Sequence, residues 1–290
     1  LFSAPQHHYT QMLINAEPSG LPAHNPVGAP LLEVDDLKVW FPIKKGLLRK
    51  TVDYVKAVDG INFSLPQGQT LGIVGESGSG KSTLLRCATM LEKIDDGELS
   101  YLGERAAYSQ NGEAVYEAPG KLKQLKSYYG LVFQNFNLFP HYSVMKNICD
   151  APIRVQKRGK DEVYKEAREL LKKMGLQDKE NAYPRELSGG QKQRIAMVRA
   201  LILNPEIMLF DEVTASLDPE MVQEVLNVIR ALAEEGRTML LVTHEMNFAR
   251  QVSSEVVFLH QGLVEEQGSP QQVFENPTSA RCKQFMSSHR

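Results

Sequence analysis

Cysteine is scarce in this sequence, and the cysteines that it has are scattered. Cys87, Cys149 and Cys282 show neither C-x-x-C spacing nor a neighbouring histidine cluster. They therefore indicate neither a zinc site nor a disulfide framework. This usage fits a protein of the reducing cytosol.

A charge of one sign is also lacking. The chain carries 33 Lys and Arg against 35 Asp and Glu, a net charge of -2. A nucleic-acid binder normally has a basic stripe and a high pI, so this balance argues against a nucleic-acid partner. A short basic cluster, Lys44-Lys45 and Arg49-Lys50, is either a solvated loop or a surface held near lipid headgroups.

Long hydrophobic runs are absent from the sequence as well. Apolar runs such as Ile207–Phe210 are only a few residues long, whereas a membrane-spanning helix needs about 20 apolar residues. Work at a membrane would therefore go through a partner. The composition is otherwise that of a globular protein, with 42% hydrophobic residues in 290, enough for one or two domains.

The apolar periodicity predicts strands that alternate with helices. Residues 31–41 predict a strand broken by a turn at Asp35-Asp36, and residues 55–65 a second strand with a turn at Asp59-Gly60, both antiparallel in style. Further along, the alternation predicts a mainly parallel sheet with helices on its faces, an α/β fold. The later strands are expected at 71–74, 207–210, 239–242 and 256–259, and the helices at 82–93, 160–175, 192–203 and 219–235.

Residues 75–82 read GESGSGKS, the G-x-x-x-x-G-K-[ST] pattern of a phosphate-binding loop. Between a strand and a helix, its glycines can aim backbone N–H groups at phosphate oxygens, where the helix N-terminus adds partial positive charge. A chance Gly- and Ser-rich turn is disfavoured by this strand–loop–helix context. Lys81 would reach the β- and γ-phosphates of ATP, and Ser82 would bind Mg²⁺. The candidate nucleotide-binding residues are Gly75, Glu76, Ser77, Gly78, Ser79, Gly80, Lys81, Ser82 and Thr83.

Two carboxylates follow another apolar strand. In EIMLFDE, four apolar residues lead to Asp211 and Glu212. Asp211 is placed to hold Mg²⁺ directly or through water, and Glu212 could polarise an attacking water. Such a pair can also simply cap the next helix, but the phosphate loop favours the catalytic role.

LSGGQ at residues 187–191 predicts a second phosphate-binding helix start. Ser188 and Gln191 form an S-x-x-Q capping box, and Gly189 and Gly190 precede a helix end that can bind an anion. One ATP does not need two such sites from one chain. Two chains packed head to tail would instead hold each ATP between the loop at Gly75 of one chain and the LSGGQ segment of the other.

Six motifs in order make residues 31–270 resemble the ATP-binding-cassette (ABC) ATPases. They are GESGSGKS (75–82), VFQ (132–134), LSGGQ (187–191), LFDE (209–212), ASLD (215–218) and VTHE (242–245). The resemblance implies a P-loop NTPase fold: a mixed sheet with a RecA-like core, an antiparallel β subdomain, and a helical subdomain at about 135–195. Residues 271–290 would form a C-terminal tail.

The resemblance also implies catalytic roles. Gln134 matches the glutamine that touches Mg²⁺ and the attacking water and senses the transmembrane partner. Glu212 matches the catalytic base, and His244 matches the histidine that contacts the γ-phosphate and holds the transition state. Lys81 completes the implied catalytic set.

Further residues match positions at the edges of the family's site. Asp218 matches the aspartate that communicates across the dimer. Phe41, or its neighbour Trp40, matches the aromatic residue that stacks on adenine, and Tyr54 is a weaker competitor. Such an aromatic residue is more often part of a core than a platform for a base.

The chain departs from the family pattern at two places. Val213 stands where the family usually has Pro after the catalytic Glu, and Ala215 and Ser216 are exchanged relative to the usual SALD. Neither change removes a catalytic group. Both put the fine geometry of the dimer-crossing loop in doubt.

The resemblance implies an importer ATPase that sits peripherally on the cytoplasmic face of the inner membrane. Its partners would be transmembrane permease subunits, a second ABC ATPase domain and, indirectly, an extracytoplasmic substrate-binding protein. Residues 82–290, with VFQNFNLFPH and THEM, look like importer ATPases for polar amino acids. Residues 31–80 look like oligopeptide-importer ATPases, so di- and oligopeptides are the alternative cargo.

Other cassette ATPases fit less well. Repair and chromosome proteins place a long coiled coil between the phosphate loop and LSGGQ, and no sustained heptads separate Lys81 from Ser188. Translation-type members carry two complete cassettes and a basic linker, and VFQNFNLFPH argues against an exporter.

The first residues resemble the end of a cassette. LFSAPQHHYTQML shares with VFENPTSARCKQFM (Val273–Met286) an aliphatic residue followed by Phe and then Pro three residues later. Residues 14–30 are rich in Pro, Gly, Ala and Asn and read as a linker. Residues 1–30 are therefore expected to be the tail of a preceding cassette plus a linker, or an unrelated leader peptide.

Overall fold

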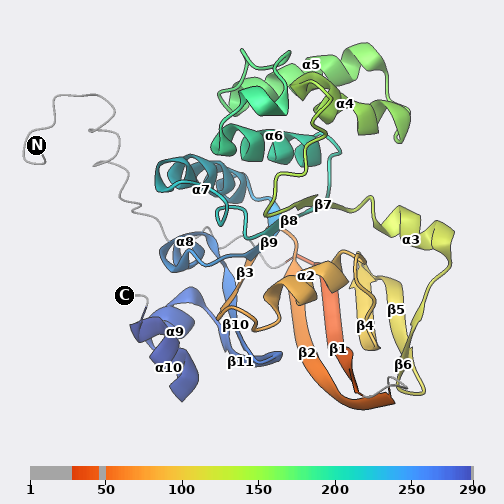
Figure 1. The fold of residues 1–290 in the computed structure, drawn as a ribbon, viewed down its shortest axis with the longest axis vertical. Coiled ribbons are helices and arrows are strands. Elements are labelled where there is room, and N and C mark those ends of the chain that lie inside the picture. The colour runs from red at the N-terminus through yellow and green to blue at the C-terminus, as the bar shows by residue number, and fades with distance from the viewer. Residues whose placement is uncertain (1–27, 46–49, 289–290) are drawn as a thin grey trace, which may run out of the picture.

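The computed structural model describes residues 28–45 and 50–288, so the expectations about residues 1–27 lie outside the described part. Within it, the strands form two sheets with the helices around them (Figure 1). One sheet has the strand order β2-β1-β4-β5-β6, and the other has the order β11-β10-β3-β9-β8-β7.

The first sheet is antiparallel throughout, as the early strands predicted. Its strand β4 alternates half-buried and buried residues, so one face of this strand packs on the core and the other is partly open to solvent. Its strands are β1 (Pro30–Lys45), β2 (Lys50–Pro66), β4 (Asp96–Tyr101), β5 (Glu104–Gln110) and β6 (Glu113–Tyr116).

The two predicted turns in this sheet are wrong. β1 runs on through Asp35-Asp36, and β2 runs on through Asp59-Gly60, each with an irregular register at that point. Asp36 (φ +47°) and Gly60 (φ +78°) are left-handed, as expected of β-bulges.

The core explains both bulges. Val34 and Leu37 are three residues apart, as are Val58 and Ile61, and all four are buried. In a regular strand an odd spacing would place the two members of a pair on opposite faces. One extra residue returns the second member to the core face.

The second sheet is mixed, as predicted. β10, β3, β9, β8 and β7 pair in parallel, and β11 closes the edge by pairing antiparallel with β10. β3 is buried along its whole length, which is typical of a strand covered on both faces. The strands are β3 (Thr70–Gly75), β7 (Tyr129–Val132), β8 (Ile207–Asp211), β9 (Thr238–Val242), β10 (Glu255–His260) and β11 (Leu263–Gly268).

The long amphipathic helices are close to their predicted bounds, whereas the helix expected at 82–93 is shorter. It ends at Ala88, and Met90 is left-handed (φ +53°), so the chain turns away there. The helices are α2 (Lys81–Ala88), α3 (Pro119–Leu125), α4 (Val144–Arg154), α5 (Lys160–Lys173), α6 (Gly189–Leu201), α7 (Pro219–Glu234), α8 (Met246–Val252), α9 (Pro270–Glu275) and α10 (Ala280–Ser287), with a 3-10 turn at Pro184–Glu186.

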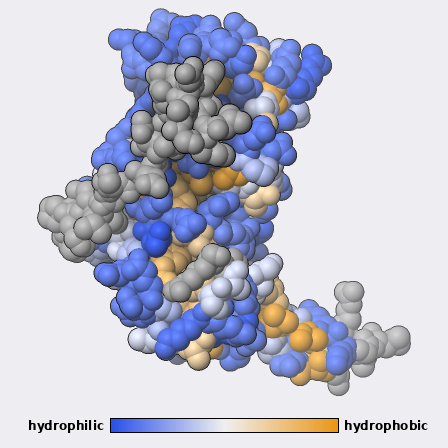
Figure 2. Space-filling model, turned by 90° about the vertical axis from the view of Figure 1, so that its left-hand side faces the viewer, coloured by the Kyte–Doolittle hydropathy of each residue, from blue (hydrophilic) through white to orange (hydrophobic). Residues whose placement is uncertain are grey.

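Three helices, α4, α5 and α6, gather at one end of the molecule (Figure 1). They follow β7 and precede β8 in the chain, and the division predicted at 135–195 stays a prediction. The face in Figure 2 is mostly hydrophilic over this end. In the described part of the chain, no helix combines the length and the apolar character that crossing a membrane requires.

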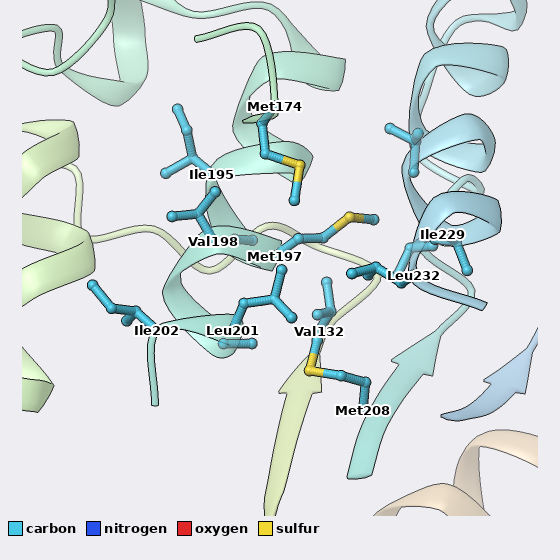
Figure 3. Close-up of a cluster of buried hydrophobic side chains, with 14 of the residues drawn as sticks. Val132, Met174, Ile195, Met197, Val198, Leu201, Ile202, Met208, Ile229 and Leu232 are labelled. Carbon is cyan, nitrogen blue, oxygen red and sulfur yellow. The ribbon is translucent and has the colours of Figure 1, made fainter. Parts of the chain in front are cut away.

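A buried cluster joins α6 to the sheet. Figure 3 shows α6 residues, Met197 among them, facing side chains from two strands and α7. The packing therefore fixes α6 against the strands that lead to the predicted site. The labelled members are Val132, Met174, Ile195, Met197, Val198, Leu201, Ile202, Met208, Ile229 and Leu232.

We expect Met197→Ala to destabilise the protein by about 2–5 kcal/mol, because it removes a fully buried side chain and leaves a cavity. Val155→Ala is the control, since Val155 is 68% exposed and should change stability by less than about 0.5 kcal/mol. Urea denaturation measures both. Equal midpoints for the two variants would contradict the cluster's role.

Candidate functional site

The phosphate loop lies at the carboxyl end of β3, between its neighbours β10 and β9. The loop requires glycine where the backbone turns into α2. Gly80 is left-handed (φ +102°), and a Cβ there would come within 2.2 Å of the Ala57 carbonyl oxygen. The predicted strand–loop–helix arrangement is confirmed.

Lys81 begins α2 and is buried. Its Nζ donates hydrogen bonds to the carbonyl oxygens of Gly75 (2.9 Å) and Glu76 (2.8 Å). It also lies 4.0 Å from Glu212 Oε1. Burial lowers the pKa of Lys81, and the neighbouring carboxylates Glu212 and Asp211 oppose that shift.

Glu212 and His244 meet beside this lysine. Glu212 Oε1 lies 2.8 Å from His244 Nε2. The Glu212 N–H donates to the Val242 carbonyl oxygen (2.9 Å), which fixes the end of β8 against β9 just before His244. Glu212 is left-handed (φ +45°), a backbone conformation that is uncommon for glutamate and that is found where a site holds a residue in place.

Asp211 ends β8 next to Ser82. Burial raises the pKa of Asp211, Glu212 adds to the rise, and a hydrogen bond from the Ser82 side chain opposes it. Asp211 Oδ1 is buried without a hydrogen-bond partner, and such an orphaned acceptor is suited to a cation.

This pair of oxygen ligands fits Mg²⁺. Mg²⁺ prefers one or two carboxylates together with substrate phosphates and water rather than a cage made only by protein. Across residues 28–45 and 50–288, no group of three or more His, Cys, Asp or Glu side chains could hold a metal ion. Phosphate oxygens would have to complete the set that Asp211 and Ser82 begin.

Lys81, Ser82, Glu212 and His244 line a cavity of about 520 Å³, and Asp211 is not among its lining residues. Three consecutive residues of β2 and one residue after β10 also line it, and the sequence prediction missed them because no motif marks them. Their place beside the loop appears only in three dimensions, as where the Ala57 carbonyl oxygen lies close to Gly80. The lining residues are Val55, Lys56, Ala57, Ser77, Gly78, Ser79, Gly80, Lys81, Ser82, Thr83, Glu212, His244 and Gln261.

The three aromatic candidates, Trp40, Phe41 and Tyr54, differ in their surroundings. The Trp40 Nε1–H donates to Asp59 Oδ1 (3.0 Å), and Lys56 Nζ lies 5.0 Å from the centre of its ring. Phe41 is 43% exposed and pairs with Val55, which lines the cavity. Tyr54 is also exposed, 6.4 Å from Trp40 between ring centres. None of these three rings lines the cavity, so the choice of Phe41 as the ring that stacks on adenine stays a prediction.

The LSGGQ segment caps α6 as predicted, although α6 begins at Gly189 rather than Lys192. Ser188 Oγ accepts from the Gln191 N–H (3.3 Å), and Gln191 Oε1 accepts from the Ser188 N–H (3.0 Å). Among the described residues that line the cavity, none comes from 188–191. The site in one chain therefore does not use its own LSGGQ segment.

The segment that carries Gln134 is tied to α6. Gln193 Nε2 donates to the Phe133 carbonyl oxygen (3.1 Å), and Arg199 donates to the carbonyl oxygens of Phe136 and Asn137. Gln134 itself is half-buried and does not line the cavity. The LSGGQ helix thus holds the Gln134 segment in place.

The ASLD segment lies on the surface beside this region. Asp218 is exposed at the start of α7. Ser216 Oγ lies 3.5 Å from Asn135 Oδ1, so the exchanged Ser contacts the Gln134 segment. Val213 is buried, and it packs in the same core cluster as α6. Val213 therefore keeps an apolar contact where the family usually has Pro.

A family model described as "ABC transporter" matches residues 58–215. The chain belongs to the ABC transporter family. It is an ATP-binding, ATP-hydrolysing subunit of the kind that drives transport.

Relatives of known assignment are similar over most of the chain. "Octopine permease ATP-binding protein P" of Rhizobium meliloti is 46% identical over 82% of this chain and 92% of its own. "Arginine transport ATP-binding protein ArgV" of Corynebacterium glutamicum is 47% identical over 82% of this chain and 94% of its own. "Histidine transport ATP-binding protein HisP" of Pseudomonas aeruginosa is 50% identical over 78% of this chain and 90% of its own.

A solved structure supports the fold. It is a dimeric ATP-binding cassette in a post-hydrolysis state with ADP and Pi bound. It superposes with a TM-score of 0.69 at 30% identity, over 82% of this chain and 98% of its own. The α/β cassette fold predicted from the six motifs is confirmed.

We expect Asp211→Asn to lose Mg²⁺-dependent ATP hydrolysis without losing stability. The raised pKa of Asp211 means that folding disfavours its charged form, so its carboxylate costs stability once the pH exceeds its unfolded-state pKa. At neutral pH, asparagine should leave Tm unchanged or raise it by about 2–4 °C for a gain near 1 kcal/mol.

Calorimetry and an ATPase assay check this expectation. Asp178→Asn, at an exposed carboxylate, is the matched control. A large drop in Tm for Asp211→Asn, or retained Mg²⁺-dependent hydrolysis, would contradict the assignment.

Proposed function

We propose that this chain is the ATPase subunit of an importer for polar amino acids. The observation that supports ATP hydrolysis is the position of Glu212, which lies close to both His244 and Lys81 at the phosphate loop. The cargo assignment is supported by the relatives that are named for octopine, arginine and histidine transport. The sheet positions the site, and the cargo itself never enters it.

The residues of the loop hold the nucleotide. Backbone N–H groups of residues 76–81 and the Lys81 ammonium bind the β- and γ-phosphates, and Phe41 stacks on adenine. Ser82 and Asp211 would hold Mg²⁺, and Gln134, which does not line the cavity of this chain, would add a further ligand. The ion would neutralise charge that develops on the phosphates. The low-dielectric surroundings of the buried Lys81 strengthen its attraction for phosphate.

Glu212 acts on the attacking water. Its carboxylate accepts the proton of the water as the water attacks, and the Nε2 contact from His244 orients it. His244 and Lys81 then stabilise negative charge on the transferred phosphoryl group. The chemistry depends on positioning and electrostatics more than on covalent steps.

A second cassette completes each site. The LSGGQ segment lies outside the cavity of its own chain, so Ser188, Gly189, Gly190 and Gln191 serve the ATP held by a partner. Asp218, exposed nearby in the chain, contacts that partner. The partner is a second copy of this chain or a tandem cassette on the same polypeptide.

Membrane permease subunits dock on the helical end. Phe139 is 51% exposed and packs with His141 and Tyr142 in a small aromatic group. The buried Asn147 side chain fixes their loop by hydrogen bonds to the backbone of Phe139 and Tyr142. This group follows the Gln134 segment directly and offers permeases an apolar contact at the cytoplasmic face of the inner membrane.

We expect Glu212→Gln to bind ATP and to accumulate as a closed dimer with little hydrolysis, because the amide keeps the shape of the carboxylate but cannot accept the proton. Phosphate release and size-exclusion chromatography with ATP–Mg²⁺ measure the two effects. Lys81→Ala is the paired variant and should lose nucleotide binding instead. Near-normal turnover by Glu212→Gln would refute the role of Glu212.

The cargo is tested in the complete transporter. A purified complex with permeases and an extracytoplasmic substrate-binding protein, in liposomes, should raise its ATPase rate with arginine or histidine. Stimulation by di- or oligopeptides with none from amino acids would overturn the cargo assignment. It would favour the peptide importers that residues 31–80 resemble.

A further inference from the structure

α10, the last helix in the described part of the chain, contacts the phosphate loop through Arg281. Arg281 of α10 places Nη2 2.5 Å from Oε1 of Glu76, the second residue of GESGSGKS. The other terminal nitrogen, Nη1, donates to Gln284 Oε1 (2.7 Å). His260 Nδ1, at the end of β10, lies 3.8 Å from the second oxygen of Glu76. Residues 205 positions apart therefore share one ion pair on the phosphate loop, next in sequence to residues 77–83 that line the cavity.

α10 is held firmly enough to position this arginine. Cys282, Phe285 and Met286 are buried against β10, and the Phe285 and Phe258 rings lie 5.1 Å apart. Ser279 caps the helix by accepting from the N–H groups of Arg281 and Cys282. Since β10 pairs with β3, α10 and the loop belong to one packed unit.

Glu76 needs such a partner, because its charge opposes the loop's task. Its side chain is a carboxylate in a loop that binds a polyanion. Its carbonyl oxygen accepts from Lys81 Nζ (2.8 Å) and from the Ser79 N–H (3.2 Å), so Glu76 also sets the shape of the loop. A carboxylate on this loop would repel the phosphates that the loop binds, and repulsion between like charges is felt even near the surface.

We propose that Arg281 is a positioning residue for ATP binding. Its guanidinium neutralises the Glu76 carboxylate and fixes that residue in the loop, so the C-terminal helix is part of the nucleotide site. The proposal goes beyond the motif residues, and it rests on the proposed placement of the ATP phosphates in this loop.

The test measures the affinity for ATP–Mg²⁺ by calorimetry in four proteins. These are the parent chain, Arg281→Gln, the double variant Arg281→Gln with Glu76→Gln, and Arg250→Gln. Arg250 of α8 is the control because it pairs with Glu275 on α9 (3.5 Å) and is not among the residues that line the cavity. Tm is recorded for each protein.

Arg281→Gln should weaken ATP binding about tenfold at low salt and less at 0.5 M salt, since exposed charges are screened there. The double variant should recover most of that loss, and Arg250→Gln should bind as the parent does. A purely structural role for Arg281 would give neither rescue by Glu76→Gln nor dependence on salt. Equal affinity of Arg281→Gln and the parent, or failure of the rescue, would overturn the proposal.

Two further outcomes are separable. If the parent chain itself does not bind ATP–Mg²⁺, the proposed site fails rather than the role of Arg281. If Arg281→Gln does not fold, the single variant Glu76→Gln tests the proposal instead. At low salt it should bind ATP at least as tightly as the parent, and a tenfold loss would overturn the charge argument.

Discussion

The parallel pairing of β3, β9 and β8 is the constraint on which the site depends. Parallel strands end at the same edge of a sheet, so the phosphate loop, the pair Asp211-Glu212 and the segment before His244 arrive together. The contact of Glu212 with both Lys81 and His244 follows from that arrangement. Residues from three distant stretches of sequence become one reaction centre because their strands are neighbours.

The second constraint is the packing that surrounds this edge. α6 is anchored to β7, β8 and α7 by the cluster in Figure 3, and its donors hold the backbone on either side of Gln134. The C-terminal helices cover β10 on the other side and reach the loop through Arg281. The site is therefore supported from both flanks by elements that contribute no motif of their own, apart from LSGGQ.

Much of this could be predicted from the sequence, and the reasons are local. GESGSGKS, LFDE and the S-x-x-Q pattern at Ser188 each specify a short backbone geometry, so they fixed the loop, the end of β8 and the start of α6. The alternation of predicted strands with predicted helices indicated a mainly parallel sheet, and the resemblance to the cassette ATPases implied the mixed one. The bulges at Asp36 and Gly60 were mistaken for turns because turn residues and bulge residues share the same left-handed preference.

The features that were missed depend on long-range contact. Val55, Lys56 and Ala57 line the cavity because β2 passes the glycines of the loop. Arg281 meets Glu76 because α10 packs on β10. Neither the β2 residues nor Arg281 have a residue type or a spacing that marks them in a single sequence. The helix expected at 82–93 was predicted too long for a different reason, since the chain turns away where Met90 is left-handed.

The hydrogen bonds between α6 and the Gln134 segment can couple two binding affinities. Gln193 and Arg199 connect α6, which begins in LSGGQ, to the segment after β7 that contains Gln134. The same segment continues to the aromatic group at Phe139. When two binding sites are coupled through one structural element, each ligand changes the affinity for the other by the same factor. In the proposed complex, the coupling free energy by which a permease bound at Phe139 changes the affinity of α6 for the nucleotide of a facing cassette would equal the one by which that nucleotide changes the affinity for the permease.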